Sequence, residues 1–503
     1  MVAVMCIALI CSALPAFAAT YYVDSSEGED RSAGTSPDTA WRGLDKVNAT
    51  TFQPGDRILL KAGLVWSGRL WPKGSGEEGR PIAIDQYGEG PKPVINGEGA
   101  AFEAIHLRDQ QHWEISNLEV TNHGASGAAP RAGVRVLGER GGVLNHIHLR
   151  SLDVHGVNGD CHRGRDKGKC NAGILFDVIG DEVRTRFHDV LIEGCRLHGC
   201  DRSGIKTWTD WGRQHEGGWE PYTDLVIRGN MLDDIGGDGI VACMADGPLI
   251  EHNVVSNCNR RSGDYNVAIW VWETDDAVMQ FNEAYLTRTK KDGQGFDVDG
   301  FTRRTIVQYN YSHDNEGGFI LLCNYWEPDQ SFFNDGVIVR YNISQNDRER
   351  IFQIGGKVTN ALICNNTIYV GKGQGDAYII QDHQPAGLPG NFHYWNNIFY
   401  NLGSGGYRLN PSGNSVFDYN AFFGTHPDTE PDDPHKITDD PKLVSPGSGR
   451  IGRDTVDGYR LEPDSPCMDS GVAIPDNGGR DYWGNPVPAG GGTDRGAHER
   501  PAE

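Results

Sequence analysis

The chain has 503 residues, and its 46 basic against 69 acidic residues give a net charge of −23 with histidines neutral. A protein this acidic repels nucleic acid, so DNA and RNA are excluded as expected partners. With 67 glycines, 25 prolines and 38% hydrophobic residues, the composition predicts a folded, loop-rich, all-β protein rather than a helical or disordered one.

Residues 1–19 form an apolar stretch that ends in Ala16, Phe17 and Ala18, the small-x-small pattern of a signal-peptidase site. We expect cleavage after Ala18 or Ala19 and a secreted or periplasmic protein. A buried strand or a membrane anchor is the alternative for this stretch. No later stretch approaches the ~20 apolar residues of a membrane span, so we expect a mature monomer without membrane contact.

Export permits disulfides, and the mature chain would keep nine of the 11 cysteines, an odd number that leaves at least one unpaired. Two local pairs could bridge, namely Cys161 with Cys170 and Cys195 with Cys200, and the sequence leaves the pairing open. Cys323 and Cys364 lie in apolar runs and are expected in the core. The cysteine spacings are too wide for a zinc–thiolate site.

A short strand-like phrase built around asparagine returns at intervals of 23 to 32 residues. Its strong copies lie at Asn230, Asn253, Asn282, Asn310, Asn342, Asn366, Asn397 and Asn420, and weaker copies at Asn117, Ser151 and Cys195. Such a period of short strands is typical of a β-solenoid. Stacked asparagine amides would pair with buried turn backbone and with each other, and asparagine tolerates a left-handed turn conformation. The repeat therefore predicts an asparagine ladder.

The ends of the mature chain read TYYVDSSEGEDRSAGTSPDTAWRGLDKVN, followed by FQPGDRILLKAGLVWSGRL, and SPCMDSG, followed by TDRGAHE. With the repeat, these phrases resemble the carbohydrate-active right-handed parallel β-helix proteins of the pectate-lyase-like superfamily. The resemblance implies an all-β, single-stranded right-handed parallel β-helix. We expect a signal peptide at 1–19, the β-helix with its N-terminal cap at 20–425, and C-terminal coils and a cap at 426–503. Activity stays open, because this fold hosts lyases, hydrolases, epimerases and non-catalytic adhesins.

A second strand recurs between the asparagine turns, in the phrases GILFD, GIKTW, GIVAC, AIWVW, GFDVD and GFILL. Alternation along each strand predicts two inward columns. These are Ile174, Ile205, Ile240, Ile269, Phe296 and Phe319, and then Phe176, Thr207, Ala242, Val271, Val298 and Leu321. The outward positions then hold Lys206 with Trp208, Val241 with Cys243, Trp270 with Trp272, Asp297 with Asp299, and Ile320 with Leu322.

Coils of such a helix stack ~4.8 Å apart, so the two outward tryptophans are expected directly beside Asp297 and Asp299. Aromatic faces next to carboxylates suit a sugar ring. Asp292 adds a third carboxylate from the turn before the strand. Like charges this close raise at least one pKa, which provides the acid and the base of glycoside hydrolysis. We therefore expect Asp292, Asp297 and Asp299 to be catalytic.

The seven-residue separation of Asp292 and Asp299 resembles the catalytic pair of β-helix hydrolases of the lacto-N-biosidase type. On that resemblance Asp292 is the acid/base and Asp299 the nucleophile. Geometry alone makes Asp297 with Asp299 an equally good pair, and neither retention nor inversion follows from the sequence. The phrase DGQGFDVD could instead hold calcium, the one candidate cofactor.

Substrate contacts are expected from the outward columns and the turns beside them. These residues are Lys206, Trp208, Trp270, Trp272, Glu273, Lys291, Arg303 and His313, and Trp326 could cap a far subsite. The alternative for the tryptophans is cover by long loops. The alternative for His313 is a role in pairing turn backbone groups.

A polysaccharide lyase, which removes a proton beside a uronate with Lys, Arg or His, is the competing class. A basic rim in turns next to the same strands favours it: Arg260, Arg261, Arg288, Lys290, Lys291, Arg303 and Arg304. The alternative for this basic rim is a set of solvated surface charges without a binding role. The long Lys/Arg signature of β-helix alginate and chondroitin lyases is missing. A non-catalytic binding protein is a third possibility, and we expect a hydrolase of a poly- or oligosaccharide ahead of both.

Overall fold

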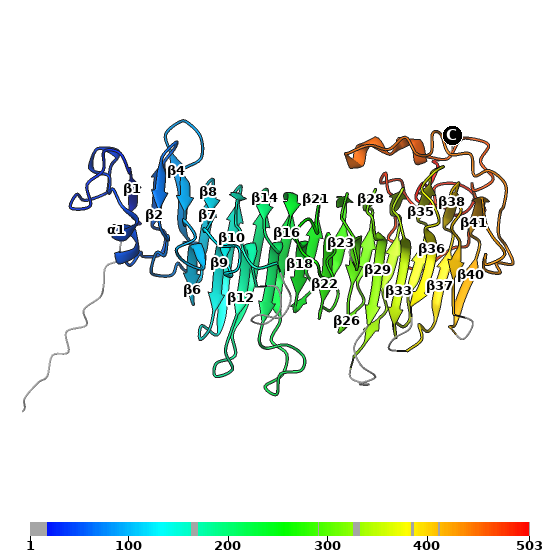
Figure 1. Ribbon diagram of the computed structural model, residues 1–503, viewed down its shortest axis with the longest axis horizontal. Coiled ribbons are helices and arrows are strands. Elements are labelled where there is room, and N and C mark those ends of the chain that lie inside the picture. The colour runs from blue at the N-terminus through cyan, green and yellow to red at the C-terminus, as the bar shows by residue number, and fades with distance from the viewer. Residues whose placement is uncertain are drawn as a thin grey trace, which may run out of the picture.

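The computed structural model describes residues 18–161, 170–289, 291–324, 332–383, 387–410 and 413–501. Within them the chain winds into one elongated coil of parallel strands, with the N-terminal residues at one end and the C-terminal segment folded back along the other (Figure 1). Three long sheets run the length of the coil, and successive coils pair in parallel. The fold prediction, a right-handed parallel β-helix, is confirmed.

The fifteen-strand sheet contains β1 (Thr20–Val23), β2 (Arg57–Lys61), β4 (Ile82–Tyr87), β7 (Trp113–Ser116), β10 (Val143–Arg150), β13 (Arg186–Glu193), β16 (Tyr222–Arg228), β20 (Leu249–Glu251), β23 (Val278–Gln280), β27 (Ile306–Gln308), β31 (Ile338–Arg340), β34 (Leu362–Cys364), β37 (Phe392–Trp395) and β40 (Ser415–Asp418), with β19 (Ala245–Asp246) beside β16. The thirteen-strand sheet contains β3 (Val65–Ser67), β5 (Val94–Asn96), β8 (Glu119–Thr121), β11 (Asp153–His155), β14 (Arg196–Cys200), β17 (Met231–Ile235), β21 (Val254–Ser256), β24 (Glu283–Tyr285), β28 (Tyr311–His313), β32 (Ile343–Gln345), β35 (Thr367–Val370), β38 (Ile398–Asn401) and β41 (Ala421–Gly424).

The eleven-strand sheet contains β6 (Glu103–Arg108), β9 (Ala132–Gly138), β12 (Ala172–Val178), β15 (Ser203–Thr209), β18 (Asp238–Cys243), β22 (Ile269–Trp272), β25 (Gln294–Val298), β29 (Gly318–Asn324), β33 (Arg350–Gly356), β36 (Tyr378–His383) and β39 (Tyr407–Arg408). A small ribbon pairs β26 (Thr302–Arg303) with β30 (Asn334–Asp335). One short helix, α1 (Leu44–Ala49), belongs to the N-terminal cap, and 3-10 turns lie at Pro37–Thr39, Arg453–Thr455 and Asp457–Tyr459. None of the described helices is long and apolar enough to cross a membrane.

The asparagine ladder is confirmed from Asn230 to Asn420. Each side-chain Nδ2 donates to the Oδ1 of the next asparagine at 2.9–3.0 Å, and the same Oδ1 accepts the backbone N–H of the coil before. Asp433 ends the ladder by accepting from Asn420 at 2.9 Å. Because every rung is buried, each amide satisfies backbone groups that water cannot reach.

The left-handed turn conformation does not belong to the ladder asparagines. It belongs to the residue before each of them, for example Tyr309 at φ 57° before Asn310. The weak copies at Asn117 (φ 57°) and Ser151 (φ 52°) occupy that same preceding position, so they are not rungs. Buried leucines follow both, because the first coils fill this corner with apolar side chains.

Neither of the two candidate disulfides forms. None of the nine cysteines among the described residues is joined to another by a disulfide. Cys195 and Cys200 are each buried in the core, and burial raises the pKa of both thiols to about 12. Cys323 and Cys364 are buried, as expected. Cys195 directly precedes strand β14 and Cys200 ends it, so their short separation in the sequence does not bring the two sulfur atoms together.

The inward columns hold except in β29. Phe296 pairs with Ile320 and Asp297 with Leu321, so Leu321 points outward and Ile320 points inward. Phe319 still packs in the core, against Phe296 at 5.9 Å between ring centroids. Phe319 and Ile320 are adjacent core residues, and the arrangement recurs in the next two strands as Ile351 with Phe352 and Ile379 with Ile380. Gly318 (φ 134°) begins β29. An added Cβ there would lie 1.8 Å from the carbonyl oxygen of Arg350.

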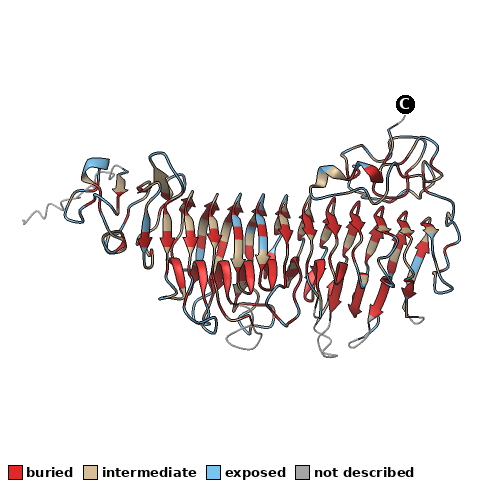
Figure 2. Cartoon of the chain, turned by 45° about the horizontal axis from the view of Figure 1, so that its top comes forward, coloured by how far each residue is buried: buried red, intermediate tan, exposed pale blue. Residues whose placement is uncertain are grey.

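Residues after β41 do not continue the three sheets as further full coils. They return along the outer face of the thirteen-strand sheet and cover its last strands (Figures 1 and 2). A second apolar cluster forms there, in which Tyr459, Leu461 and Tyr482 pack on Tyr311 and Ile343. This segment covers the thirteen-strand sheet from β28 onward and does not cover the cleft side of the eleven-strand sheet.

Candidate active site

A cleft of about 940 Å³ lies over the outward side of the eleven-strand sheet. The strands of this sheet from β15 to β39 form much of the floor of the cleft. Because each successive coil adds one outward side chain, these side chains form a continuous row along the floor. The lining residues are Lys206, Trp208, Asp238, Cys243, Tyr265, Asn266, Val267, Trp270, Trp272, Lys291, Asp292, Asp297, Asp299, Leu321, Cys323, Glu349, Arg350, Gln353, Asp376, Tyr378, Gln381 and Arg408. Five of the eight predicted substrate contacts and all three predicted catalytic aspartates are among these lining residues.

Three aspartates gather in the middle of the cleft around Cys323. Burial raises the pKa of the Cys323 thiol well above its usual value, and the negative charges of Asp299, Asp297 and Asp292 raise it further. The thiol also forms a hydrogen bond with the Asp299 side chain. The three aspartates and Cys323 line the same cleft, so the structure brings the predicted carboxylates together.

The turn before β25 places Asp292 at the cleft. Gly293 adopts φ 107°, and a Cβ at this position would lie 2.8 Å from the carbonyl oxygen of Arg288, so only glycine fits. Arg350 holds the turn from the far side by donating to the carbonyl oxygens of Lys291 at 2.9 Å and Asp292 at 3.4 Å. The backbone of Asp292 is thus tied to strand β33, two coils further on.

Tryptophans form the wall next to the carboxylates. Trp270 pairs in register with Asp297, which confirms the expected neighbourhood of the two columns. Its Nε1 donates to Asp238 at 2.9 Å. Trp272 stacks on Trp208 with ring centroids 5.6 Å apart, and the Lys206 ammonium lies 4.7 Å from the Trp208 ring. The half-buried rings present flat apolar surface beside the acidic centre.

Glu273 does not reach the cleft, contrary to the prediction. Its side chain is 2% exposed and accepts a hydrogen bond from the backbone N–H of Arg213. Burial raises the pKa of Glu273 to about 7, although the contact with Arg213 acts against this. The local backbone explains why the Glu273 side chain points away from the cleft. Glu273 adopts φ 56°, which turns the chain directly after β22 and directs the side chain under the loop that follows β15.

Arg303 and His313 also lie away from the cleft. Arg303 belongs to the small ribbon and stacks over Phe333 at 4.0 Å. His313 belongs to the thirteen-strand sheet and contacts Glu283 at 3.1 Å and Asp314 at 2.9 Å. Burial lowers the pKa of His313, but the hydrogen bonds to these two carboxylates outweigh it and raise the pKa to about 9. His313 therefore has a structural role beneath the C-terminal cover.

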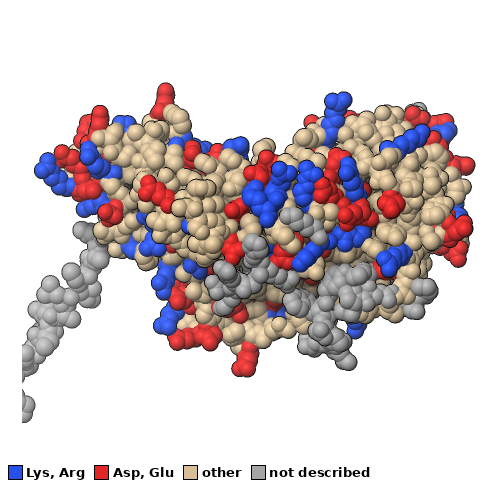
Figure 3. Space-filling view, in the orientation of Figure 1, with Lys and Arg blue, Asp and Glu red and all other residues tan. Residues whose placement is uncertain are grey.

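Most of the predicted basic rim is neutralised by acidic partners. Arg261 pairs with Asp201 at 2.5 Å and Asp234 at 2.6 Å, Arg304 pairs with Asp276 at 2.6 Å, and Arg288 pairs with Glu316. Charges of both signs are mixed over the middle of the molecule (Figure 3). Lys291 does line the cleft, 3.7 Å from Asp264. Lys290 and Trp326 fall outside the described residues.

The sequence analysis missed the far half of the cleft. The outward column that contains Lys206, Trp270 and Asp297 continues in register through Leu321, Gln353, Gln381 and Arg408. Glu349, Arg350, Asp376 and Tyr378 line the cleft beside it. The signal was present in the strand phrases RIFQIGG and YIIQDH, which extend the alignment by two coils. The alignment of the phrases GFDVD and GFILL placed β29 one residue away from its register in the structure, and this error concealed the continuation of the column.

Fold and cleft together define a parallel β-helix with a long groove lined by carboxylates and tryptophans. No protein-family model matches the chain. A lacto-N-biosidase from Bifidobacterium longum subsp. longum is 29% identical over 445 aligned residues, which cover 70% of this chain and 27% of that protein. The chain therefore spans about a quarter of the length of that relative.

Two solved structures share the fold. The GH136 lacto-N-biosidase from Eubacterium ramulus superposes with a TM-score of 0.61 and 24% identity, over 80% of this chain and 67% of that chain. The complex of XylC with xylose superposes with a TM-score of 0.54 and 12% identity, over 95% and 98%. At these identities the likeness shows the β-helix architecture.

Proposed function

We propose that this protein is a glycoside hydrolase that cleaves a poly- or oligosaccharide, and that it is exported. The observation that carries the proposal is the group of three carboxylates around Cys323, set beside the tryptophan wall in one open cleft. Glycoside hydrolysis needs one protonated and one ionised carboxyl across the scissile bond. The name of the Bifidobacterium relative supports the same reaction class.

In the proposed reaction, Asp292 donates a proton to the glycosidic oxygen and Asp299 acts on the anomeric carbon from the other face. Asp299 accepts a hydrogen bond from the backbone N–H of Gly300 at 2.7 Å, which orients its carboxyl group. If Asp299 attacks directly, a covalent intermediate forms and water resolves it with Asp292 as base. Asp297 stands in register with Trp270 and lines the cleft, where it can accept hydrogen bonds from sugar hydroxyls.

The substrate class we propose is a neutral oligosaccharide, with a lacto-N-bioside as the first candidate. The relatives' name supports this choice. The ion pairs of Arg261, Arg288 and Arg304 support it as well, because they leave little of the predicted basic rim for a polyuronate. Tryptophan faces stack on the apolar side of neutral sugar rings.

The test is a panel of a lacto-N-bioside, other neutral glycans and uronate polymers, each with calcium or chelator. New reducing ends and the ultraviolet absorbance of unsaturated uronate are followed in parallel. Reducing ends without absorbance are expected, on the neutral substrates. Absorbance that rises with the reducing ends would identify a lyase and refute the proposal. Binding without any cleavage would indicate a non-catalytic protein.

We expect Trp270→Ala and Trp272→Ala to raise KM at least about tenfold, since an aromatic contact contributes about 0.5–1.5 kcal/mol beyond the area it buries. Steady-state kinetics on the best substrate of the panel measure the change. Trp395→Ala is the matched control, because this tryptophan lies on the fifteen-strand sheet and packs on His393. An unchanged KM in both cleft variants would remove the tryptophans from the binding site.

A further inference from the structure

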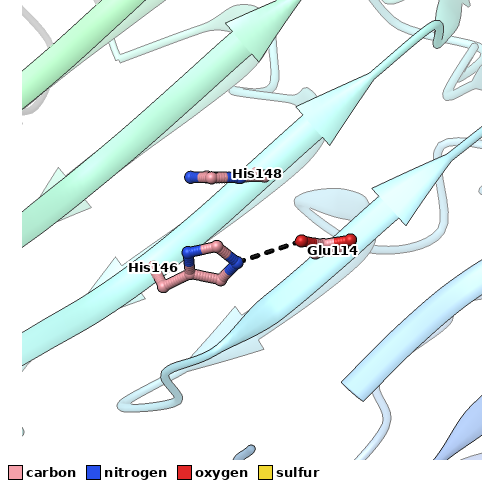
Figure 4. A group of neighbouring side chains, drawn as sticks. All are labelled: Glu114, His146 and His148. Atoms are coloured by element: carbon pink, nitrogen blue, oxygen red, sulfur yellow. Dashed lines mark hydrogen bonds and ion pairs between the residues drawn. The ribbon is translucent and has the colours of Figure 1, made fainter. Parts of the chain in front are cut away.

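A second group of reactive side chains lies on the fifteen-strand sheet, away from the cleft. His146 and His148 alternate along β10, Glu114 comes from β7, and Asp189 comes from β13. Figure 4 shows the His146 ring directed at the Glu114 carboxylate, with the His148 ring beside it. His148 pairs in register with Glu114. Three neighbouring coils therefore contribute to one patch.

Both ring nitrogens of His146 face carboxylates. Nδ1 lies 2.7 Å from Asp189 Oδ2, and Nε2 lies 3.0 Å from Glu114 Oε1. A neutral imidazole carries one N–H, so it can donate to only one of them, and the other nitrogen then turns a lone pair toward a carboxylate oxygen. A cation between Nε2 and Glu114 removes this repulsion. That cation is either a second proton on the ring or a metal ion.

Asp189 contacts both histidines. Its Oδ2 lies 2.7 Å from His146 Nδ1 and its Oδ1 lies 2.8 Å from His148 Nε2, so one carboxylate orients the two rings side by side.

We propose that Glu114, His146 and His148 bind a divalent transition metal ion, with zinc as the ion to test. Their ligand atoms all lie within 4.8 Å of one another. Ligands of a tetrahedral zinc stand about 3.3 Å apart, given zinc–ligand distances of about 2.0 Å, so the three groups must draw closer together when the metal binds. His148 must also exchange its contact with Asp189 or with Arg150 for the metal. His146 binds through Nε2 while its Nδ1–H donates to Asp189, the arrangement by which a carboxylate orients a metal-binding histidine.

The exposure of the ligands and the nearby Arg150 both affect how this site would bind a metal ion. The Glu114 and His146 side chains are 32% and 23% exposed, so a water molecule can take the remaining position. Arg150 opposes the ion, because it donates to His148 Nδ1 at 2.8 Å and lies 3.6 Å from Glu114. Its second contact, with Glu193 at 3.4 Å, gives Arg150 an alternative partner when the metal enters. The ion would link β7 to β10 and thereby stabilise the first half of the coil.

The test uses the full chain, freed of metal with a chelator. Calorimetric titration with zinc is expected to show one site per chain, and thermal unfolding is expected to shift to higher temperature with zinc. His146→Ala and His148→Ala are expected to weaken binding at least about tenfold, since loss of even an orienting partner costs 10–100-fold. Arg150→Gln is expected to bind zinc more tightly, because it removes the competing charge.

Two controls keep the outcome interpretable. His188→Ala alters the next coil, where the ring contacts Thr223 and Asp224, and should bind zinc as the unmodified protein does. Glu114→Gln keeps the size of the side chain and removes only its charge, so a loss of binding there does not reflect misfolding. Cobalt absorption separates imidazole ligands from thiolate ligands. Absence of a 1:1 site, a site that survives both histidine variants, or a thiolate spectrum would overturn the proposal.

Discussion

We expect Asp299→Asn to lower kcat by about 10³-fold or more on the best substrate, because acid–base and nucleophilic groups in such a site contribute at least 10²–10⁴-fold. The variant retains a side-chain oxygen for the Gly300 N–H, so the fold should survive. Asp292→Asn should be similarly impaired if it is the acid/base. Initial rates of reducing-end formation measure both losses.

Azide distinguishes the two roles. With Asp299→Ala, added azide should restore turnover and yield a glycosyl azide of inverted configuration if Asp299 is the nucleophile. With Asp292→Ala, the azide product should keep the substrate's configuration. Asp276→Asn is the matched control, since this carboxylate pairs with Arg304 outside the cleft lining. Full activity in Asp299→Asn combined with a large loss in Asp297→Asn would move the nucleophile to Asp297.

We expect Asn310→Ala to lower the free energy of unfolding by about 3–5 kcal/mol, because it leaves several buried polar groups without partners at about 1–3 kcal/mol each. Asn310 donates to Met279 O at 2.9 Å and to Asn342 Oδ1 at 3.0 Å, and its own Oδ1 accepts from Asn282. Urea unfolding measures the loss. Asn145→Ala, which removes a surface contact with Gln111, should cost at most about 1 kcal/mol.

An equal effect of the two asparagine substitutions would show that the ladder does not carry the stability of the coil. Cooperative unfolding at a lower urea concentration in Asn310→Ala alone would show the opposite. Because each rung bonds to the next, a lesion at the centre of the ladder disturbs the coils on both sides.

The periodicity of the sequence was enough to predict much of the fold of this protein. The asparagine phrase predicted the coil, because each rung needs the same residue at the same place in the next coil. Strand alternation then predicted that Trp270 would neighbour Asp297, and the structure pairs them in register. A parallel coil transmits register from strand to strand through backbone hydrogen bonds, so a correct alignment of sequence repeats is also an alignment in space.

Where a coil departs from the sequence repeat, only the tertiary structure shows which way its side chains point. The structure pairs β29 with β25 one residue away from the alignment of the phrases GFDVD and GFILL, which places Leu321 in the cleft and in the column that ends at Arg408. The turn at Glu273 buried a predicted substrate ligand.

The sequence by itself determined the β-helix, its ladder, and the meeting of tryptophans with aspartates, since all three follow from a short-range pattern repeated in every coil. Only the tertiary structure decided that His313 lies under the returning C-terminal segment, that Cys195 and Cys200 stay reduced in the core, and that Glu114 and His146 meet. The physical reason is that these contacts depend on turns that occur in a single coil and on a segment that folds back across many coils. Neither feature repeats from coil to coil, so neither produces a periodic pattern in the sequence.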